Sequence, residues 1–171
     1  MIVLITGGSG CGKSYYAERL IRRLANGHEM YYIATMDAYD DESKMRVLRH
    51  QTQRKGLGFH TIEQPLSLDA VEIPSASAAI VECVPTLLSN EMFLAGGRVD
   101  SIPLGIKQLC GTCAELVVVT NDVFSDGQVY DAATEAYKRL LARINREIAG
   151  MADCVIEVVY SIPVAVKGAL P

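Results

Sequence analysis

The chain has 171 residues, half of them hydrophobic, and a net charge of −4. That length suits one domain with one sizeable core. Together with the glycine-rich motif described next, it predicts a single nucleotide-binding domain over residues 1–171. The acidic balance, without a basic stripe, argues against a nucleic-acid partner, and the apolar runs are too short for a membrane span. No signal peptide precedes the first apolar run, so we expect a cytoplasmic protein.

A glycine-rich stretch follows the apolar run Ile2-Val3-Leu4-Ile5. Its spacing is G-x-x-x-x-G-K-[ST], placed between a predicted strand and a helix-like segment, which is the context of a phosphate-binding loop rather than of a plain turn. Backbone N–H groups and the positive helix end would surround phosphate oxygens. Lys13 would neutralise the β- and γ-phosphates, and the Ser14 hydroxyl would contact Mg²⁺. The predicted phosphate-binding residues are Gly7, Gly8, Ser9, Gly10, Cys11, Gly12, Lys13 and Ser14.

Apolar runs alternate with longer amphipathic stretches along the whole chain. This alternation predicts an α/β protein with a mostly parallel sheet and helices on both faces. The expected strands lie near residues 2–6, 30–34, 78–83, 115–120 and 154–160. The expected helices lie near residues 13–25, 41–55, 86–94, 102–112 and 130–150, and a short helix and loop are expected within 64–77.

Ligands of such sheets lie outside the carboxyl ends of the strands. This rule indicates three stretches besides the phosphate loop, namely Ala34-Thr35-Met36-Asp37, Glu82-Cys83 and Thr120-Asn121-Asp122. Glu82 ends a buried strand beside the phosphate loop, where a carboxylate holds Mg²⁺ directly or through water. The alternative for Glu82 is an ordinary helix-capping acid.

Arg46, His50 and Arg54 recur every four residues and so share one face of the helix expected over 41–55. A histidine between two guanidiniums suits phosphate binding, because the cations would hold a triphosphate and keep the imidazole neutral. A neutral imidazole could then attack an α-phosphorus and release pyrophosphate. A solvated cationic helix face is the alternative. Met45, Leu48 and Thr52 fall largely on another face, which we expect to pack.

Two further features favour structural roles. Cys110 and Cys113 have C-x-x-C spacing, but no second pair or suitably spaced histidine completes a zinc site, so we expect small buried residues near a helix end. Asn145 interrupts the apolar stripe of the helix expected over 130–150, and we expect it to make a polar contact between helices or subunits.

Several motifs occur together in this chain, namely the phosphate loop, Tyr32-Ile-Ala-Thr35, Asp40-Asp-Glu42, Arg46-Val-x-x-His50 with Arg54, Thr61-Ile-Glu63, Glu82-Cys83, Ser89-Asn90, Val119-Thr-Asn121 and Asn145. This combination resembles one family, the bifunctional adenosylcobinamide kinase / adenosylcobinamide-phosphate guanylyltransferases of cobalamin biosynthesis. The resemblance runs from the first strand to Ile162-Pro163 and Val166-Lys167-Gly168. Phe59 and the loop after Thr120-Asn121 depart from the usual family pattern.

The resemblance implies a RecA-like P-loop sheet and two reactions. A nucleoside triphosphate, ATP or GTP, phosphorylates adenosylcobinamide, and GTP then guanylylates His50, from which GMP passes to the phosphorylated corrinoid. It implies catalytic roles for His50 and Lys13, Mg²⁺ at Ser14 and Glu82, and a homotrimer. Beyond the phosphate loop, the implied nucleotide-binding residues are Ala34, Thr35, Met36, Arg46, Gln51, Thr52, Gln53, Arg54, Glu63 and Glu82.

Two other functions remain open from the residues alone. One is a simple P-loop small-molecule kinase in which His50 only contacts phosphate, and the other is a GTP-binding sensor module that transfers nothing. Neither requires a histidine on the Arg46–Arg54 face, so a covalent nucleotide on His50 would discriminate against both.

Overall fold

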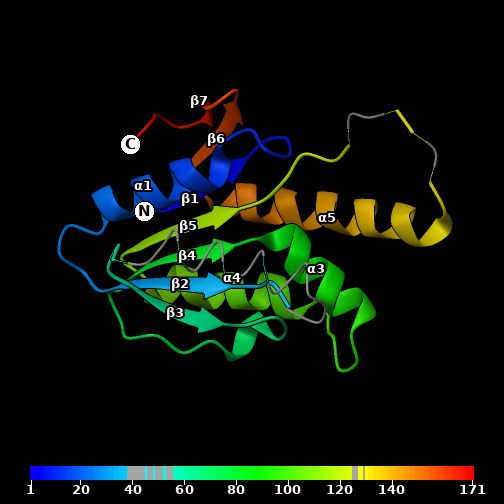
Figure 1. The fold of residues 1–171 in the computed structure, drawn as a ribbon, viewed down its shortest axis with the longest axis horizontal. Coiled ribbons are helices and arrows are strands. Elements are labelled where there is room, and N and C mark those ends of the chain that lie inside the picture. The colour runs from blue at the N-terminus through cyan, green and yellow to red at the C-terminus, as the bar shows by residue number, and fades with distance from the viewer. Residues whose placement is uncertain (38–44, 46–47, 49–51, 53–55, 125–126, 129) are drawn as a thin grey trace.

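The computed structural model describes residues 1–37, 45, 48, 52, 56–124, 127–128 and 130–171. Within these residues a seven-stranded sheet has the order β3-β2-β4-β5-β1-β6-β7, and every pairing except the antiparallel one of β6 with β7 is parallel (Figure 1). The strands are β1 (Ile2–Thr6), β2 (Met30–Ala34), β3 (Phe59–Glu63), β4 (Ala78–Glu82), β5 (Glu115–Val119), β6 (Cys154–Val159) and β7 (Ile162–Lys167).

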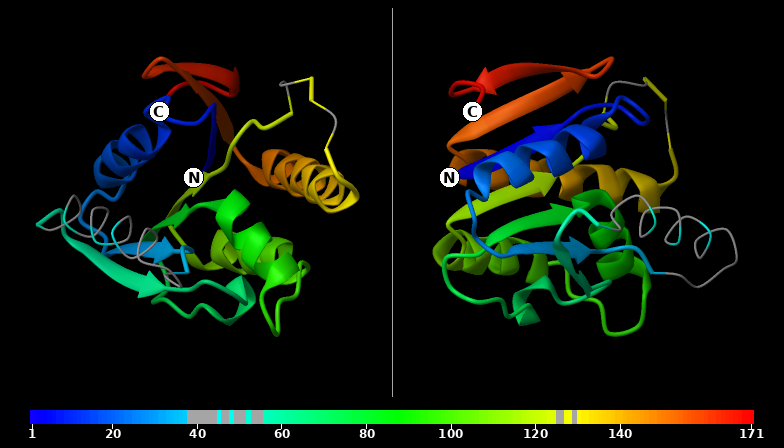
Figure 2. Two further views of the ribbon diagram at one scale, coloured as in Figure 1. Left: turned by 45° about the vertical axis from the view of Figure 1, so that its right-hand side comes forward. Right: turned by 60° about the vertical axis from the view of Figure 1, so that its left-hand side comes forward.

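Helices cover both faces of this sheet, as Figure 2 shows. One face packs on α1 (Lys13–Leu24), and the other packs on α3 (Val84–Phe93), α4 (Ser101–Thr112) and α5 (Ala132–Met151). Successive side chains of a strand point to opposite faces, so Val3 and Ile5 join the α1 core whereas Leu4 joins the other. The predicted fold class, an α/β P-loop protein with a mostly parallel sheet covered on both faces, is confirmed.

All five predicted strands are present, but the sequence analysis missed β3 and β7. Both are edge strands of the sheet. Their side chains are mostly half-buried or exposed, so neither strand needs the continuous apolar run that identifies a buried parallel strand. The predicted strand near 154–160 ends at Val159, and the chain then turns back as β7.

Two helices begin earlier than predicted because a proline sits inside the first turn of each. Pro85 follows Val84 in α3, and Pro103 lies two residues after Ser101 in α4. Proline is tolerated there, since the first-turn N–H groups have no partner within the helix. The short helix expected within 64–77 is a 3₁₀ turn, η1 (Leu68–Ala70). The helix expected over 41–55 lies mostly outside the described residues.

The helix predicted near 130–150 is α5, and Asp131 caps it by accepting a hydrogen bond of 2.9 Å from the Thr134 N–H. On α4, Cys110 and Cys113 are half-buried free thiols at the carboxyl end, and burial raises the pKa of Cys113 to about 12. In the part of the chain that the structure describes, no helix is long and apolar enough to cross a membrane.

Candidate functional site

The phosphate loop, Gly7–Ser14, joins the carboxyl end of β1 to the first turn of α1. Gly10 and Gly12 have φ of 70° and 92°, in the left-handed region that suits glycine. Gly7 approaches β6 so closely that an added Cβ would lie 2.5 Å from the Val158 carbonyl oxygen. Glycine at these positions therefore gives the loop its curvature and its contact with the neighbouring strand.

Lys13 and Ser14 are the first residues of α1. The Lys13 side chain is buried inside the phosphate loop, and its Nζ donates a hydrogen bond of 3.0 Å to the Gly8 carbonyl oxygen. The Ser14 side chain hydrogen-bonds to the Glu82 carboxylate. The Lys13 ammonium and the Ser14 hydroxyl, which is bonded to the Glu82 carboxylate, therefore lie at the N-terminus of α1. The positive end of a helix favours the binding of anionic oxygens.

Glu82 ends β4 and lies across from the phosphate loop. Its carboxylate also accepts a hydrogen bond from the Tyr32 hydroxyl. Burial raises the pKa of Glu82 to about 7, and the nearby Glu18 acts in the same direction, while Ser14 and Lys13 oppose the shift. A carboxylate held close to its charge transition at neutral pH gains its full charge when a cation binds beside it.

A cavity of about 200 Å³ opens at this edge of the sheet. It brings together seven residues that the sequence analysis assigned to the site, namely Lys13, Ser14, Ala34, Thr35, Met36, Glu63 and Glu82. Cys83 and Asn121, which the rule on strand ends had indicated, also line it. The sequence analysis did not mention Thr86, and it quoted Tyr32 and Val119 only as parts of motifs.

Thr86 and Tyr32 illustrate why these positions were missed. Tyr32 lies within β2 and is 2% exposed, so its pattern is that of a core residue, although its hydroxyl donates a hydrogen bond to Glu82. Thr86 lies in the first turn of α3 and contacts the Cys83 thiol at 3.0 Å. The contact at Tyr32 depends on the pairing of β2 with β4, which the sequence does not record.

Hydrogen bonds from two side chains, those of Thr35 and Asn90, hold the part of the cavity wall around Thr35 in place. The Thr35 hydroxyl lies 3.0 Å from the carbonyl oxygens of Glu82 and Cys83. Asn90 of α3 is buried and donates to the carbonyl oxygens of Thr35 (2.8 Å) and Pro65 (3.0 Å). The segments that follow β2, β3 and β4 are therefore held together behind the cavity.

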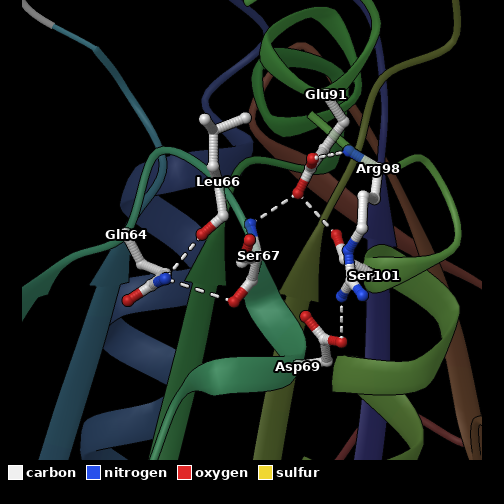
Figure 3. Close-up of polar contacts among 7 residues, drawn as sticks. All are labelled: Gln64, Leu66, Ser67, Asp69, Glu91, Arg98 and Ser101. Carbon is white, nitrogen blue, oxygen red and sulfur yellow. Dashed lines mark hydrogen bonds and ion pairs between the residues drawn. The ribbon is translucent and has the colours of Figure 1, made fainter. Parts of the chain in front are cut away.

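The residue after Asn90 organises a second polar group, the Glu91 cluster, which consists of Ser67, Glu91, Arg98 and Ser101 (Figure 3). The Glu91 carboxylate accepts hydrogen bonds from the Ser67 N–H at 2.6 Å, the Arg98 N–H at 2.5 Å and the Ser101 hydroxyl at 2.5 Å. Glu91 is 3% exposed, so these bonds replace water around the carboxylate. The cluster supports the loops behind the site without lining the cavity.

The segment after β5 is also tied down by side chains. The Thr120 hydroxyl donates to Asn145 Oδ1 at 2.7 Å, and the Asn145 amide approaches the Asn121 carbonyl oxygen at 3.4 Å. Asn145 therefore makes a polar contact, but it joins α5 to the segment after β5 (Glu115–Val119) and not to another helix as expected, and a contact with another subunit stays a prediction.

The segment that carries His50 lies mostly outside the described residues. Five predicted site residues, Arg46, His50, Gln51, Gln53 and Arg54, lie outside the described residues. Thr52 is described, and its hydroxyl donates to the Leu48 carbonyl oxygen at 2.8 Å, away from the residues that line the cavity. The expected packing of Met45 and Leu48 is wrong within this chain, because their side chains are 63% and 54% exposed.

Comparisons with known proteins give a consistent result. A family profile described as cobinamide kinase / cobinamide phosphate guanyltransferase matches residues 3–166. The bifunctional adenosylcobalamin biosynthesis proteins CobU of Escherichia coli K12 and Salmonella typhimurium LT2 are each 30% identical over 185 residues, which cover 98% of this chain and 100% of theirs. The flagellar accessory protein FlaH of Methanocaldococcus jannaschii aligns over 98% of this chain and 78% of its own at 10% identity and a TM-score of 0.46, a likeness too weak to bear on function.

Proposed function

The chain belongs to the cobinamide kinase / cobinamide phosphate guanylyltransferase family, and we propose from this how its residues divide two reactions between them. It is a transferase of cobalamin biosynthesis that phosphorylates adenosylcobinamide and then transfers GMP from GTP to the phosphorylated corrinoid. The observation that supports a nucleotide-dependent reaction is the cavity in which Lys13 and Ser14 meet Glu82 at the carboxyl edge of the sheet.

In the kinase reaction, Gly7–Ser14 bind the triphosphate, which is ATP or GTP. The Lys13 ammonium would exchange its bond to Gly8 for the β- and γ-phosphate oxygens. The Ser14 hydroxyl and the Glu82 carboxylate are neighbouring oxygen donors of the kind that suits Mg²⁺. Mg²⁺ bound there would offset the charge that develops on the transferred phosphoryl group.

In the guanylyltransferase reaction, the His50 imidazole nitrogen would attack the α-phosphorus of GTP. A P–N bond forms and the P–O bond to pyrophosphate breaks, so pyrophosphate leaves. A phosphate oxygen of adenosylcobinamide phosphate then attacks the same phosphorus, the P–N bond breaks, and adenosylcobinamide-GDP is released. Arg46 and Arg54 would hold the phosphates, and Ala34–Met36, Gln51–Gln53, Glu63 and Glu82 would complete the nucleotide site.

The covalent intermediate provides the sharpest test of this assignment. Incubation with GTP and Mg²⁺ should add the mass of one GMP to the intact chain, and brief acid should remove it, because a phosphoramidate is acid-labile. The His50→Ala variant should bind triphosphate but form no adduct and no GDP-linked product.

The matched control is His60→Ala, since His60 is an exposed residue of β3 whose ring stacks on Tyr31. That variant should form the adduct like the parent protein. An His50→Ala enzyme that still produced adenosylcobinamide-GDP at the normal rate would refute the histidine mechanism. If the parent protein formed no adduct either, a simple kinase or a GTP sensor would become the better assignment.

The same family membership leads us to propose a homotrimer. The exposed side chains of Met45 and Leu48 support a contact with another copy, because large apolar groups at positions expected to pack favour burial in an interface. Sedimentation of the intact protein gives the mass of the assembly, and a monomer at micromolar concentration would contradict this proposal.

A further inference from the structure

The turn between β6 and β7 has an unusual backbone for its sequence. It consists of Tyr160 and Ser161, which join the paired residues Val159 and Ile162. Both turn residues have positive φ, 49° and 66°. Two-residue hairpin turns with two positive φ angles usually contain asparagine, aspartate or glycine, and a bulky aromatic side chain is disfavoured there. The ring of Tyr160 is thus displayed at a position that selection on folding alone would not fill with tyrosine.

This turn is bonded directly to the phosphate loop. The Ser161 N–H donates a hydrogen bond of 2.8 Å to the Cys11 carbonyl oxygen. A Cβ added to Gly12 would lie 2.6 Å from Ser161 Oγ, so the two segments are in van der Waals contact. Figure 2 shows the β6–β7 hairpin beside the loop between β1 and α1. The position of Tyr160 is therefore fixed relative to any phosphate group bound by the loop.

The Tyr160 side chain is 90% exposed, although Val158, two residues earlier in β6, is 1% exposed. We propose that Tyr160 is a stacking platform for the purine base of the nucleotide whose phosphates lie in the phosphate loop. An aromatic ring on a rigid turn suits this ligand, because any purine presents a flat π-face and stacking needs no base-specific hydrogen bond. The inference rests on the proposed function, since it requires that Gly7–Ser14 bind a nucleotide.

The sheet order separates this platform from the cavity. β1, which leads into the phosphate loop, lies between β5 and β6. The cavity wall formed by Glu82 belongs to β4, on the β5 side, whereas Tyr160 follows β6 on the other side. A nucleotide is extended, so its base lies to one side of the loop that holds its phosphates. Stacking on Tyr160 would place the base of the kinase triphosphate on the β6 side of the loop. The cavity on the β5 side would then stay open to the acceptor and to the GTP of the guanylyltransferase reaction, which was assigned above to Ala34–Met36, Glu63 and Glu82.

Binding measurements with ligands that have or lack a base test the proposal. ATP, GTP and inorganic tripolyphosphate are titrated into the full-length protein with Mg²⁺. The Tyr160→Gly variant keeps the positive φ without penalty and removes the ring. It should bind ATP and GTP about tenfold more weakly, within the range of one lost stacking contact, and bind tripolyphosphate as the parent does. Tyr160→Phe should retain nucleotide affinity within about twofold.

A control and a reporter make the result specific. Val166→Ala removes an apolar side chain that is 65% exposed on the same hairpin, away from the turn, and should leave all three affinities unchanged. The sequence contains no tryptophan, so Tyr160→Trp introduces a single tryptophan, whose fluorescence can be excited selectively over that of the tyrosines. Its emission should be quenched by ATP or GTP but not by tripolyphosphate, whereas that of Val166→Trp should not respond.

The possible failures are distinguishable. If the parent protein bound neither nucleotide nor tripolyphosphate, the proposed function itself would fail. If it bound nucleotide and Tyr160→Gly bound it equally well, the phosphate loop would stand and the stacking platform would be overturned. A change of oligomeric state in Tyr160→Gly without loss of nucleotide affinity would likewise assign the ring to a protein contact instead.

Discussion

Glu82 and Glu91 are two glutamates of neighbouring elements whose surroundings differ. Glu91 is enclosed in α3, and its carboxylate accepts three hydrogen bonds from Ser67, Arg98 and Ser101. Glu82 ends β4 at the wall of an open cavity, with the Tyr32 hydroxyl and Ser14 as partners and a pKa raised to about 7. The Glu91 carboxylate is thus enclosed by hydrogen-bond donors of the chain, whereas the Glu82 carboxylate lies beside a cavity and can still bind a ligand.

These surroundings distinguish an acid with a structural role from one that is a candidate for ligand binding. A buried polar group whose partners are all supplied by the chain rigidifies the structure around it. A carboxylate that remains costly to ionise beside a cavity, a lysine and a hydroxyl is a candidate for ligand binding. The same residue type therefore supports the back of the cavity in α3 and faces the cavity in β4.

The largest effect that this comparison predicts is the loss of stability in Glu91→Ala. The change leaves the N–H groups of Ser67 and Arg98 and the Ser101 hydroxyl without their acceptor in a buried region. We expect the free energy of unfolding to fall by about 3 to 5 kcal/mol. Chemical denaturation monitored by circular dichroism measures the change.

The control for this variant is Glu72→Ala, a change at an exposed glutamate. It should alter the free energy of unfolding by no more than about 0.5 kcal/mol. A Glu91→Ala protein as stable as this control would show that the Glu91 carboxylate does not stabilise the fold.

The next effect concerns pH and distinguishes Glu82 from Glu91. The pKa of Glu82 lies above its ordinary value of 4.5 in the folded protein, at about 7. The stability that the protonated Glu82 side chain contributes is therefore fully present below pH 4.5 and is lost as the pH rises through about 7. Glu82→Gln removes this titration, so the variant should gain stability relative to the parent across that window, by up to about 3 kcal/mol.

Urea denaturation at several pH values between 4.5 and 8, without nucleotide or Mg²⁺, provides the measurement for Glu82→Gln. The difference between the two proteins should grow with pH and level off above about 7. A difference that stayed constant with pH would mean that Glu82 does not titrate in this range.

Much of this arrangement follows from the sequence, because its strongest signals are local. The phosphate loop needs only its own glycines, Lys13 and Ser14, and the buried strands β1, β4 and β5 are continuous apolar runs. The rule on strand ends then identifies Thr35 and Glu82 without any knowledge of strand order. In the structure both residues line the same cavity.

What the sequence analysis missed depends on pairing between distant segments. The edge strands β3 and β7 carry no continuous apolar run. The bond from Tyr32 to Glu82 exists because β2 and β4 are adjacent, and the Glu91 cluster joins loops that are separated in the chain. The role proposed for Tyr160 likewise depends on a turn that returns to the phosphate loop. Hydrophobic periodicity records burial, but it does not record which polar groups meet.

The smallest predicted effect concerns Arg98, whose two bonds in and beside the Glu91 cluster can be separated by one substitution. The Arg98 guanidinium pairs with Asp69 at the surface, whereas its backbone N–H donates to Glu91 (Figure 3). Arg98→Ala removes only the exposed ion pair and keeps the N–H, so we expect a loss of about 0.5 kcal/mol, which 1 M salt should abolish. Denaturation of the parent and the variant at low and high salt provides the measurement. A loss comparable to that of Glu91→Ala would place the energy of the cluster in the guanidinium rather than in the buried carboxylate and its backbone donors.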